Sequence, residues 1–121
     1  MTTLKEVDAF LYTFKELKQK HGLIILDREK NLQALLDMEM DVAQRSAIIM
    51  GLQPRDYYRG PRPDQIRKGF DFWEFGKQIT SNEKDYILYI KLAIRLETHP
   101  VICMSFHPAE RDIIFPFGNP Q

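Results

Sequence analysis

The sequence has 121 residues, 44% of them hydrophobic and 28% charged, which is the size and composition of one globular domain and excludes a disordered chain. Seventeen Lys and Arg balance seventeen Asp and Glu, which excludes a protein held to nucleic acid by bulk positive charge. The single cysteine, Cys103, excludes an intramolecular disulfide and a metal cluster built on paired cysteines.

The charges are distributed unevenly along the chain. Residues 1–44 carry a net charge of −2, residues 45–95 carry ten basic and six acidic side chains, and residues 96–121 carry −2. A basic middle therefore lies between acidic flanks. Lys5, Glu6 and Asp8 occupy the region where a signal peptide needs an apolar stretch, and no uncharged run is long enough to cross a bilayer. We therefore expect a cytoplasmic protein without a membrane partner.

Residues 1–52 are expected to be mainly helical around one short strand. Thr3 and Glu6 form a capping-box pattern, and apolar residues follow at helical spacing until Gly22 ends the helix. The apolar run 23–26 then predicts a short buried strand.

Two shorter helices are predicted next. Asp27 is expected to cap the first of them, whose apolar stripe consists of Leu32, Leu35 and Leu36. Asp41 and Gln44 form a second capping-box pattern and start the last helix, which closes at Gly51 and Pro54.

Residues 53–69 predict a basic loop, because glycines and prolines interrupt any regular pattern there. Five cations fall between residues 55 and 68, namely Arg55, Arg59, Arg62, Arg67 and Lys68. This density favours contact with an anion over a merely solvated loop.

Residues 70–117 predict an antiparallel sheet. Every even position of 86–97 is apolar, which indicates a half-buried strand with one polar face. A turn leads from it to a strand over 101–106, and residues 70–79 are a candidate strand before it. The whole chain, 1–121, is therefore expected to be one α+β domain, with N-terminal helices packed on a small, mainly antiparallel C-terminal sheet.

The apolar pattern also predicts how the last two strands pair. Pairing Leu92 with Phe106 keeps apolar residues opposite each other, and a slip of one residue would turn every side chain to the wrong face. The same register sets Lys91 opposite His107 on the other face.

A second register completes the polar face. Pairing Ile79 with Ile87 would set Lys77 opposite Tyr89, although Gly76 can mark a bulge in this pair. The polar face would then collect Lys77, Tyr89, Lys91, Arg95, Ser105 and His107.

Such a face suits the cleavage of RNA. Strand scission needs a base for the 2′-hydroxyl, an acid for the leaving 5′-oxygen and cations for the phosphate. A histidine can take either proton role near neutral pH, while tyrosine and tryptophan can stack on a base. The candidate catalytic residues are His107, Lys91, Tyr89, Lys77 and Arg59, and the candidate substrate-binding residues are Arg62, Arg95 and Trp73.

The same residues also have interpretations without a function. An exposed sheet face that carries Tyr, Lys, Arg and His is often merely solvated, and Trp73 is favoured as a core aromatic over a base platform. The sequence contains no phosphate-binding loop, no G-x-S-x-G or H-E-x-x-H motif and no metal-ligand spacing of its three histidines. We therefore expect neither a cofactor nor a metal.

Several short motifs follow one another over most of the chain. They are Ile-Ile-Met-Gly-Leu at 48–52, Asp-Tyr-Tyr-Arg at 56–59, the strand with Trp73, Leu-Tyr-Ile-Lys-Leu at 88–92 and Ser-Phe at 105–106. In order and spacing they resemble the motility quorum-sensing regulator toxin family, the messenger-RNA-cleaving toxins of bacterial type II toxin–antitoxin pairs. The stretches 60–64, 75–77, 105–110 and 115–117 resemble a longer branch of that family.

The resemblance implies a RelE-like fold and a metal-independent endoribonuclease, an mRNA interferase. It also implies neutralisation by a cognate antitoxin protein; such antitoxins typically bind DNA and often carry a zinc domain of their own. It places site roles on Arg59, Tyr89, Lys91 and His107, although the better-known members have lysine at the positions of Arg59 and His107. The family's glutamine falls on Glu74, with Gln78 or Lys77 as alternatives.

The sequence therefore supports two functional hypotheses. The first is an endoribonuclease toxin that cleaves single-stranded mRNA by acid/base chemistry. The alternative is a non-catalytic, degenerate toxin that acts as a protein- or RNA-binding module, which the departures at Arg59, Glu74 and His107 motivate.

Overall fold

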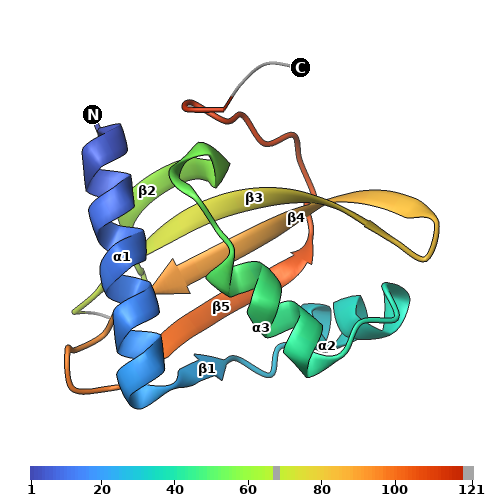
Figure 1. The fold of residues 1–121 in the computed structure, drawn as a ribbon, viewed down its shortest axis with the longest axis horizontal. Helices are drawn as coiled ribbons and strands as arrows, with labels where there is room; N and C mark the ends of the chain where they lie inside the picture. Colours follow the sequence, from blue (N-terminus) through green and yellow to red (C-terminus); the bar gives the residue numbers. More distant parts are fainter. Residues whose placement is uncertain (67–68, 119–121) are drawn as a thin grey trace.

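A five-stranded sheet with helices α1 and α3 in front of it forms the frame of the computed structural model, which describes residues 1–66 and 69–118 (Figure 1). The elements are α1 (Leu4–His21), β1 (Leu23–Ile25), α2 (Glu29–Asp37), α3 (Val42–Met50), the short 3-10 helix η1 (Pro54–Asp56), β2 (Tyr57–Pro63), β3 (Asp71–Ser81), β4 (Lys84–Ala93) and β5 (Val101–Pro108). The strand order is β1-β5-β4-β3-β2; β1 runs parallel to β5, and the other neighbours are antiparallel. The predicted α+β fold is confirmed.

Both predicted capping boxes are formed. At the start of α1, Thr3 Oγ1 accepts from the Glu6 N–H at 3.2 Å, and the Glu6 carboxylate accepts from the Thr3 N–H at 3.0 Å. Asp41 and Gln44 make the equivalent pair at the start of α3, at 2.8 and 2.9 Å. The first helix stops at Gly22 as predicted.

The start and the buried face of α2 differ from the prediction. Arg28 rather than Asp27 precedes the first turn, and its side chain makes no capping hydrogen bond. Leu32 and Leu36 lie on the surface with exposed fractions of 48% and 73%, so the predicted apolar stripe is not the packing face. The buried residues of α2 are Asn31 and Ala34.

Asn31 explains this orientation of α2, because its side chain continues the sheet where β1 ends. The Asn31 amide nitrogen donates to the carbonyl oxygens of Leu26 and Met104 at 3.0 and 3.1 Å. Its amide oxygen accepts from the Phe106 N–H at 2.9 Å. Buried backbone groups of β5 that lack a strand partner thereby find one in a side chain. The short strand β1 is an edge strand, half-buried rather than buried as predicted.

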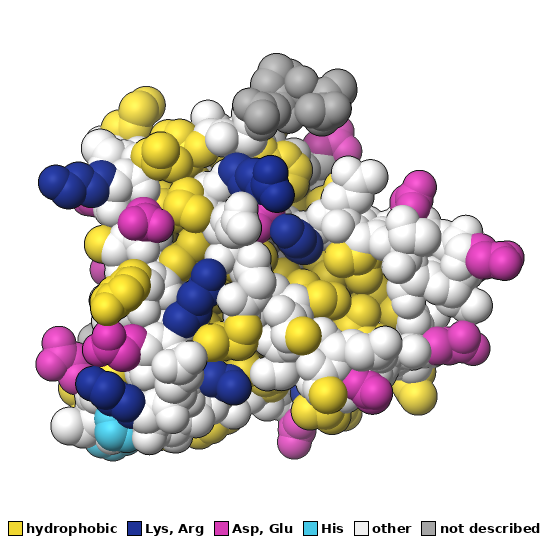
Figure 2. Space-filling view, viewed as in Figure 1, with side chains coloured by type: hydrophobic (Ala, Val, Ile, Leu, Met, Phe, Trp, Pro, Cys, Tyr) yellow, Lys and Arg dark blue, Asp and Glu magenta, His cyan; other side chains and the backbone are white. Residues whose placement is uncertain are grey.

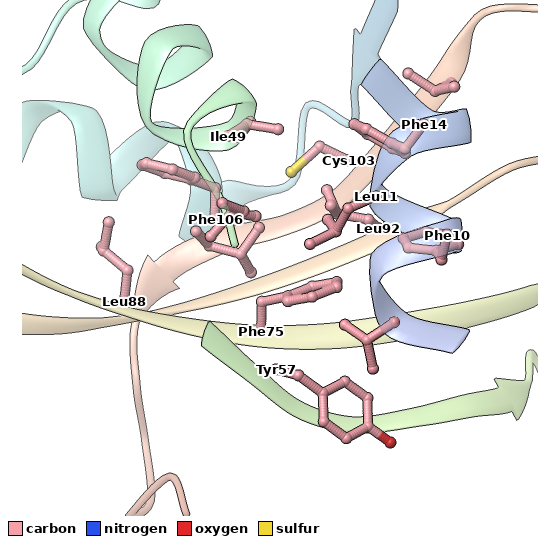
Figure 3. Close-up of a cluster of buried hydrophobic side chains, with 14 of the residues drawn as sticks. Phe10, Leu11, Phe14, Ile49, Tyr57, Phe75, Leu88, Leu92, Cys103 and Phe106 are labelled. Carbon is pink, nitrogen blue, oxygen red and sulfur yellow. The ribbon is translucent and has the colours of Figure 1, made fainter. Parts of the chain in front are cut away.

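The hydrophobic core lies between the helices and one face of the sheet (Figure 3). Its helix side is lined by Val7, Phe10, Leu11, Phe14, Leu17 and Ile49, and its sheet side by Phe75, Leu88, Ile90, Leu92, Cys103 and Phe106. Trp73 packs against this cluster, and its ring stacks on Phe10 at 4.5 Å between ring centres. Burial raises the pKa of the Cys103 thiol to about 12, so Cys103 stays protonated at neutral pH and packs in the core as a small apolar residue.

The prediction of a loop over the whole of residues 53–69 is wrong. This range contains η1 and then β2, an edge strand that includes Pro61 and Pro63. At an edge a residue without an N–H removes no bond from the sheet, so proline is tolerated there. Two cations of the predicted basic loop, Arg67 and Lys68, lie outside the described residues. The predicted strand 86–97 is too long, because β4 ends at Ala93.

The register between β4 and β5 differs from the prediction by two residues. Lys91 lies opposite Ser105, and His107 lies opposite Tyr89. The predicted Lys91–His107 pair is therefore wrong, because an irregularity between Lys91 and Leu92 interrupts the ladder and β4 stops early. An offset of two keeps the face, so Tyr89, Lys91 and His107 still share one side of the sheet.

The register between β3 and β4 differs by one residue, which reverses the face. Tyr89 lies opposite Gly76, and Lys77 lies opposite the buried Leu88. Lys77 therefore points to the side of the helices, where its Nζ lies 3.5 Å from Asp56 Oδ2. The predicted Lys77–Tyr89 pair is wrong, and the residue that shares the polar face is Glu74, opposite Lys91.

Candidate functional site

Glu74 is a buried carboxylate on the face of the sheet opposite the hydrophobic core. Its exposed fraction is 1%. Its Oε1 accepts from Arg59 Nε at 2.9 Å and from Arg62 Nη1 at 3.2 Å, and its Oε2 accepts from the Tyr89 hydroxyl at 2.5 Å. A charge removed from water needs such partners, and these three donors satisfy both oxygens. We call Arg59, Arg62, Glu74 and Tyr89 the Glu74 cluster.

Strand pairing brings the Glu74 cluster together. Arg59 lies opposite Glu74 across β2 and β3, and register shifts follow on either side of Arg59. Gly60 makes this approach possible, since it has φ 116° and a Cβ there would lie 2.9 Å from Phe72 O and 3.1 Å from Trp73 Cα. Glycine at this position therefore lets β2 lie close enough for Arg59 to reach Glu74.

His107 adjoins the Glu74 cluster through Tyr89. The two rings lie 5.5 Å apart between centres. His107 Nδ1 lies 2.9 Å from the Pro108 carbonyl oxygen, which can only accept, so Nδ1 is the donor of this bond. The other ring nitrogen, Nε2, makes no hydrogen bond within the described residues. A substrate could therefore exchange a proton with Nε2.

Tyr89 keeps its proton in this setting. Burial, followed by the hydrogen bond to Glu74, raises the pKa of the Tyr89 phenol above its ordinary value. The phenol is therefore a hydrogen-bond donor at neutral pH and does not serve as a phenolate base.

Lys91 and Arg59 both supply positive charge, but the surroundings shift their pKa values in opposite directions. Lys91 Nζ lies 3.8 Å above the centre of the Phe72 ring, and burial, with the nearby charge of Arg28, lowers its pKa. The hydrogen bond to Glu74 instead raises the pKa of Arg59, whose guanidinium lies 4.8 Å from the centre of the Tyr58 ring. Arg59 thus carries a permanent charge, whereas the charge of Lys91 is the easier one to remove.

The structure brings five of the eight predicted site residues together. Arg59, Arg62 and Tyr89 donate to Glu74, Lys91 lies opposite Glu74 in the sheet, and His107 adjoins Tyr89. The other three lie elsewhere: Lys77 on the helix side, Trp73 against the core and Arg95 exposed beyond β4. Sequence reasoning considered Glu74 only as a departure from the family's glutamine. Its position between Trp73 and Phe75, inside an apolar run, was the available signal, because a buried charge requires partners.

A pocket of about 160 Å³ opens beside this group of residues. It is lined by Tyr58, Arg59, Tyr89, His107, Ala109, Glu110, Arg111 and Ile113. The helix-covered side, shown in Figure 2, differs in character: its Lys and Arg side chains are dispersed, and an apolar area lies between the helices and the β3–β4 hairpin. Fixed cations, a histidine and a pocket thus coincide on the side of the sheet that bears Glu74.

Residues 1–66 and 69–118 contain no group of three or more His, Cys, Asp or Glu side chains arranged to hold a metal ion. None of the helices in these ranges has the length and apolar character needed to cross a bilayer.

Comparison with protein-family models, curated proteins and solved structures finds no match to the chain. The functional assignment therefore depends on the chemistry of the Glu74 cluster and its neighbours.

Proposed function

We propose that the protein is a metal-independent endoribonuclease, the mRNA-cleaving toxin of a type II toxin–antitoxin pair, with the mRNA of a bacterial cytoplasm as its substrate. The observation that carries the proposal is the convergence of His107 with the Glu74 cluster and Lys91 on one face of the sheet. The motif resemblance to the motility quorum-sensing regulator toxins supports the same activity, and membership of that family is part of the proposal.

Cleavage of RNA can proceed here without a metal. A base removes the proton of the 2′-hydroxyl, the 2′-oxygen attacks the adjacent phosphorus, and the bond from phosphorus to the 5′-oxygen breaks. An acid protonates the departing 5′-oxygen, which leaves a 2′,3′-cyclic phosphate and a 5′-hydroxyl. His107 serves one of these two proton transfers through Nε2, because its Nδ1 is held by Pro108.

Glu74 acts mainly by positioning. It is buried and already accepts from Arg59, Arg62 and Tyr89, so it holds these donors where they can face a phosphate. The free N–H groups of the two arginines stabilise the charge that builds up on the phosphate oxygens. Tyr89 gives its only hydroxyl proton to Glu74, so it helps to hold the carboxylate in place. Lys91 adds a further cation close by.

The decisive experiment compares the wild type with His107→Ala on a long RNA in the presence of a chelator. We expect the wild type to cut and the variant to be slower by roughly 100-fold or more, the usual contribution of acid–base catalysis. His99→Ala is the matched control, because His99 is an exposed turn residue away from the site. Equal cleavage by the wild type and His107→Ala would overturn the proposed role of His107.

A sulfur-substituted RNA assigns the role of His107. When sulfur replaces the leaving 5′-oxygen, departure needs no proton, so an enzyme that lacks its general acid cuts this RNA almost normally. If His107 is the acid, His107→Ala therefore recovers on this substrate. If His107 is the base, the variant stays slow.

The alternative, a non-catalytic binding module, makes a different prediction. It would bind RNA or a protein partner and yet leave every RNA intact, because Glu74 would occupy the arginines permanently. Intact RNA after incubation with pure wild type would therefore favour the alternative.

The proposal includes an antitoxin partner. Expression of the wild type in bacteria should arrest growth, and co-expression of a small neighbouring gene that encodes the antitoxin should restore it. The resemblance further implies that this antitoxin binds DNA and contains zinc. Growth arrest that persists in His107→Ala would separate toxicity from RNA cleavage and contradict the proposal.

A further inference from the structure

The pocket beside the Glu74 cluster has one wall that takes no part in the proposed cleavage chemistry. Strand residues, Tyr58 and Arg59 on β2 and Tyr89 and His107 on β4 and β5, form one side. The segment that follows β5 forms the other, through Ala109, Glu110, Arg111 and Ile113.

The size of the pocket limits its occupant. Sites for drug-sized molecules measure roughly 300–1,000 Å³, whereas this pocket measures about 160 Å³. It has room for one small ring system. Its lining includes the aromatic rings of Tyr58, Tyr89 and His107, with the Arg59 guanidinium held against the Tyr58 ring. Aromatic and guanidinium surfaces favour a flat occupant that stacks.

The segment after β5 is held in place as a wall. The Ala109 N–H donates to Ile87 O at 2.7 Å, and Lys30 binds Glu110 at 2.7 Å. Further on, the segment passes closely over Gly76, where a Cβ would lie 2.9 Å from Phe115 and 3.0 Å from Ile113. The pocket is therefore built into the fold.

We propose that this pocket binds a single nucleobase of the RNA, next to the phosphate that is cut. The inference rests on the proposed function, and it adds the part of the protein that would determine which base is preferred beside the cleaved phosphate. Arg59 lines the pocket and also belongs to the Glu74 cluster, so a nucleotide whose phosphate meets Arg59 can place its base against Tyr58. Tyr58 is thus a specificity residue, since it has no part in the hydrogen bonds around Glu74.

The first test is the cleavage pattern on a long RNA of mixed sequence. Tyr58→Ala should cut the preferred sites roughly tenfold more slowly, as expected for the loss of one base stack, and should lose base preference at one position beside the cut. Tyr58→Phe retains the ring and should retain the pattern. Tyr12→Ala, which removes an exposed tyrosine of α1, is the matched control. A wild-type rate and preference in Tyr58→Ala would overturn the inference and leave the proposed function intact.

The second test does not require cleavage. A short RNA with 2′-O-methyl groups cannot be cut, and Tyr58→Ala should bind it roughly tenfold more weakly than the wild type. Removal of the base from the one nucleotide that occupies the pocket should abolish this difference. If the wild type cuts no RNA, the proposed function fails by itself, and this measurement still decides about the pocket. Equal affinities of the wild type and Tyr58→Ala would overturn the inference.

Discussion

At the scale of single residues, Glu74 determines what its neighbours can do. Its carboxylate is fully buried, while the side chains of Arg59 and Arg62 remain 40% and 47% exposed. The arginines can therefore bind a ligand that arrives from solvent, while the buried Glu74 carboxylate holds their orientation. This division between a buried anchor and half-exposed donors is what a preorganised anion site requires.

Glu74→Gln tests this anchoring role. Glutamine keeps the shape and an acceptor oxygen but loses the charge that holds both arginines, so we expect RNA cleavage to fall by roughly 100-fold, as for the loss of one oriented charge-stabilising donor. Unfolding stability should fall by about 1–3 kcal/mol, since hydrogen bonds to a charged group are replaced by neutral ones. Rates on RNA and urea unfolding measure the two effects. Glu83→Gln, in the exposed turn between β3 and β4, is the control. Full activity in Glu74→Gln would contradict the role.

Lys91 gives a pH-dependent prediction. Burial lowers its pKa, so Lys91 loses its charge at a lower pH than an ordinary lysine does. If Lys91 contacts RNA phosphate, affinity for an uncleavable RNA should decline as the pH rises through this lowered value. Lys91→Arg should hold its affinity up to about pH 11, because arginine stays protonated there. Lys84→Arg, exposed at the start of the same strand, should behave like the wild type. Parallel pH profiles for all three proteins would count against the contact.

At the scale of elements, one side chain fixes the position of a strand. Asn31 replaces the missing continuation of β1 beside β5, and β5 carries His107. The shape of the candidate site therefore depends on a helix that contributes no residue to the Glu74 cluster.

Asn31→Ala should reveal this dependence. It leaves the Phe106 N–H and the Met104 carbonyl buried without their side-chain partner, and each unsatisfied group costs about 1–3 kcal/mol. We expect a loss of about 2–5 kcal/mol in the free energy of unfolding, measured with urea. Gln33→Ala, an exposed position on the same helix, should change stability by less than about 1 kcal/mol. A similarly small change for Asn31→Ala would show that β5 needs no such support.

The fold class could be predicted from the sequence because its signals are local. Capping boxes and the period-two pattern of β4 each depend on a few neighbouring residues, and the helices and the central strands formed where expected. The registers depend on where a strand stops and on bulges, which a pattern does not mark. The predicted β3–β4 register was wrong by one residue, which was enough to place Lys77 on the wrong face in the prediction.

The candidate site was predicted only in part, because its members are brought together by strand registers. An offset of two between β4 and β5 left Tyr89, Lys91 and His107 on one face, so this group was identified despite a wrong pairing. β2 was missed because prolines indicate loops unless the strand is known to lie at an edge. Without β2, nothing indicated that Arg59 would face Glu74.

At the scale of the whole molecule, zero net charge coexists with a concentrated cationic site. Arg59, Arg62 and Lys91 lie around Glu74, while the whole sequence carries seventeen basic and seventeen acidic side chains. We expect few RNA phosphate contacts, so the logarithm of affinity for uncleavable RNA should fall against the logarithm of salt with a slope of about −2, from −0.7 for each of three contacts. Titrations at several salt concentrations measure this. A slope several times steeper would require contacts far outside the Glu74 cluster.

The place of β5 in the sheet bears on how the protein is made. β5 is the last strand of the described chain, yet it lies between β1 and β4 and pairs residues 101–103 with residues 23–25. The early helices and the β3–β4 hairpin therefore emerge from the ribosome before the strand that joins β1 to the rest of the sheet. Until β5 is synthesised, His107 is absent and the core lacks Val101, Cys103 and Phe106. Under the proposed function, a nascent chain cannot cut the message that encodes it until synthesis has passed β5.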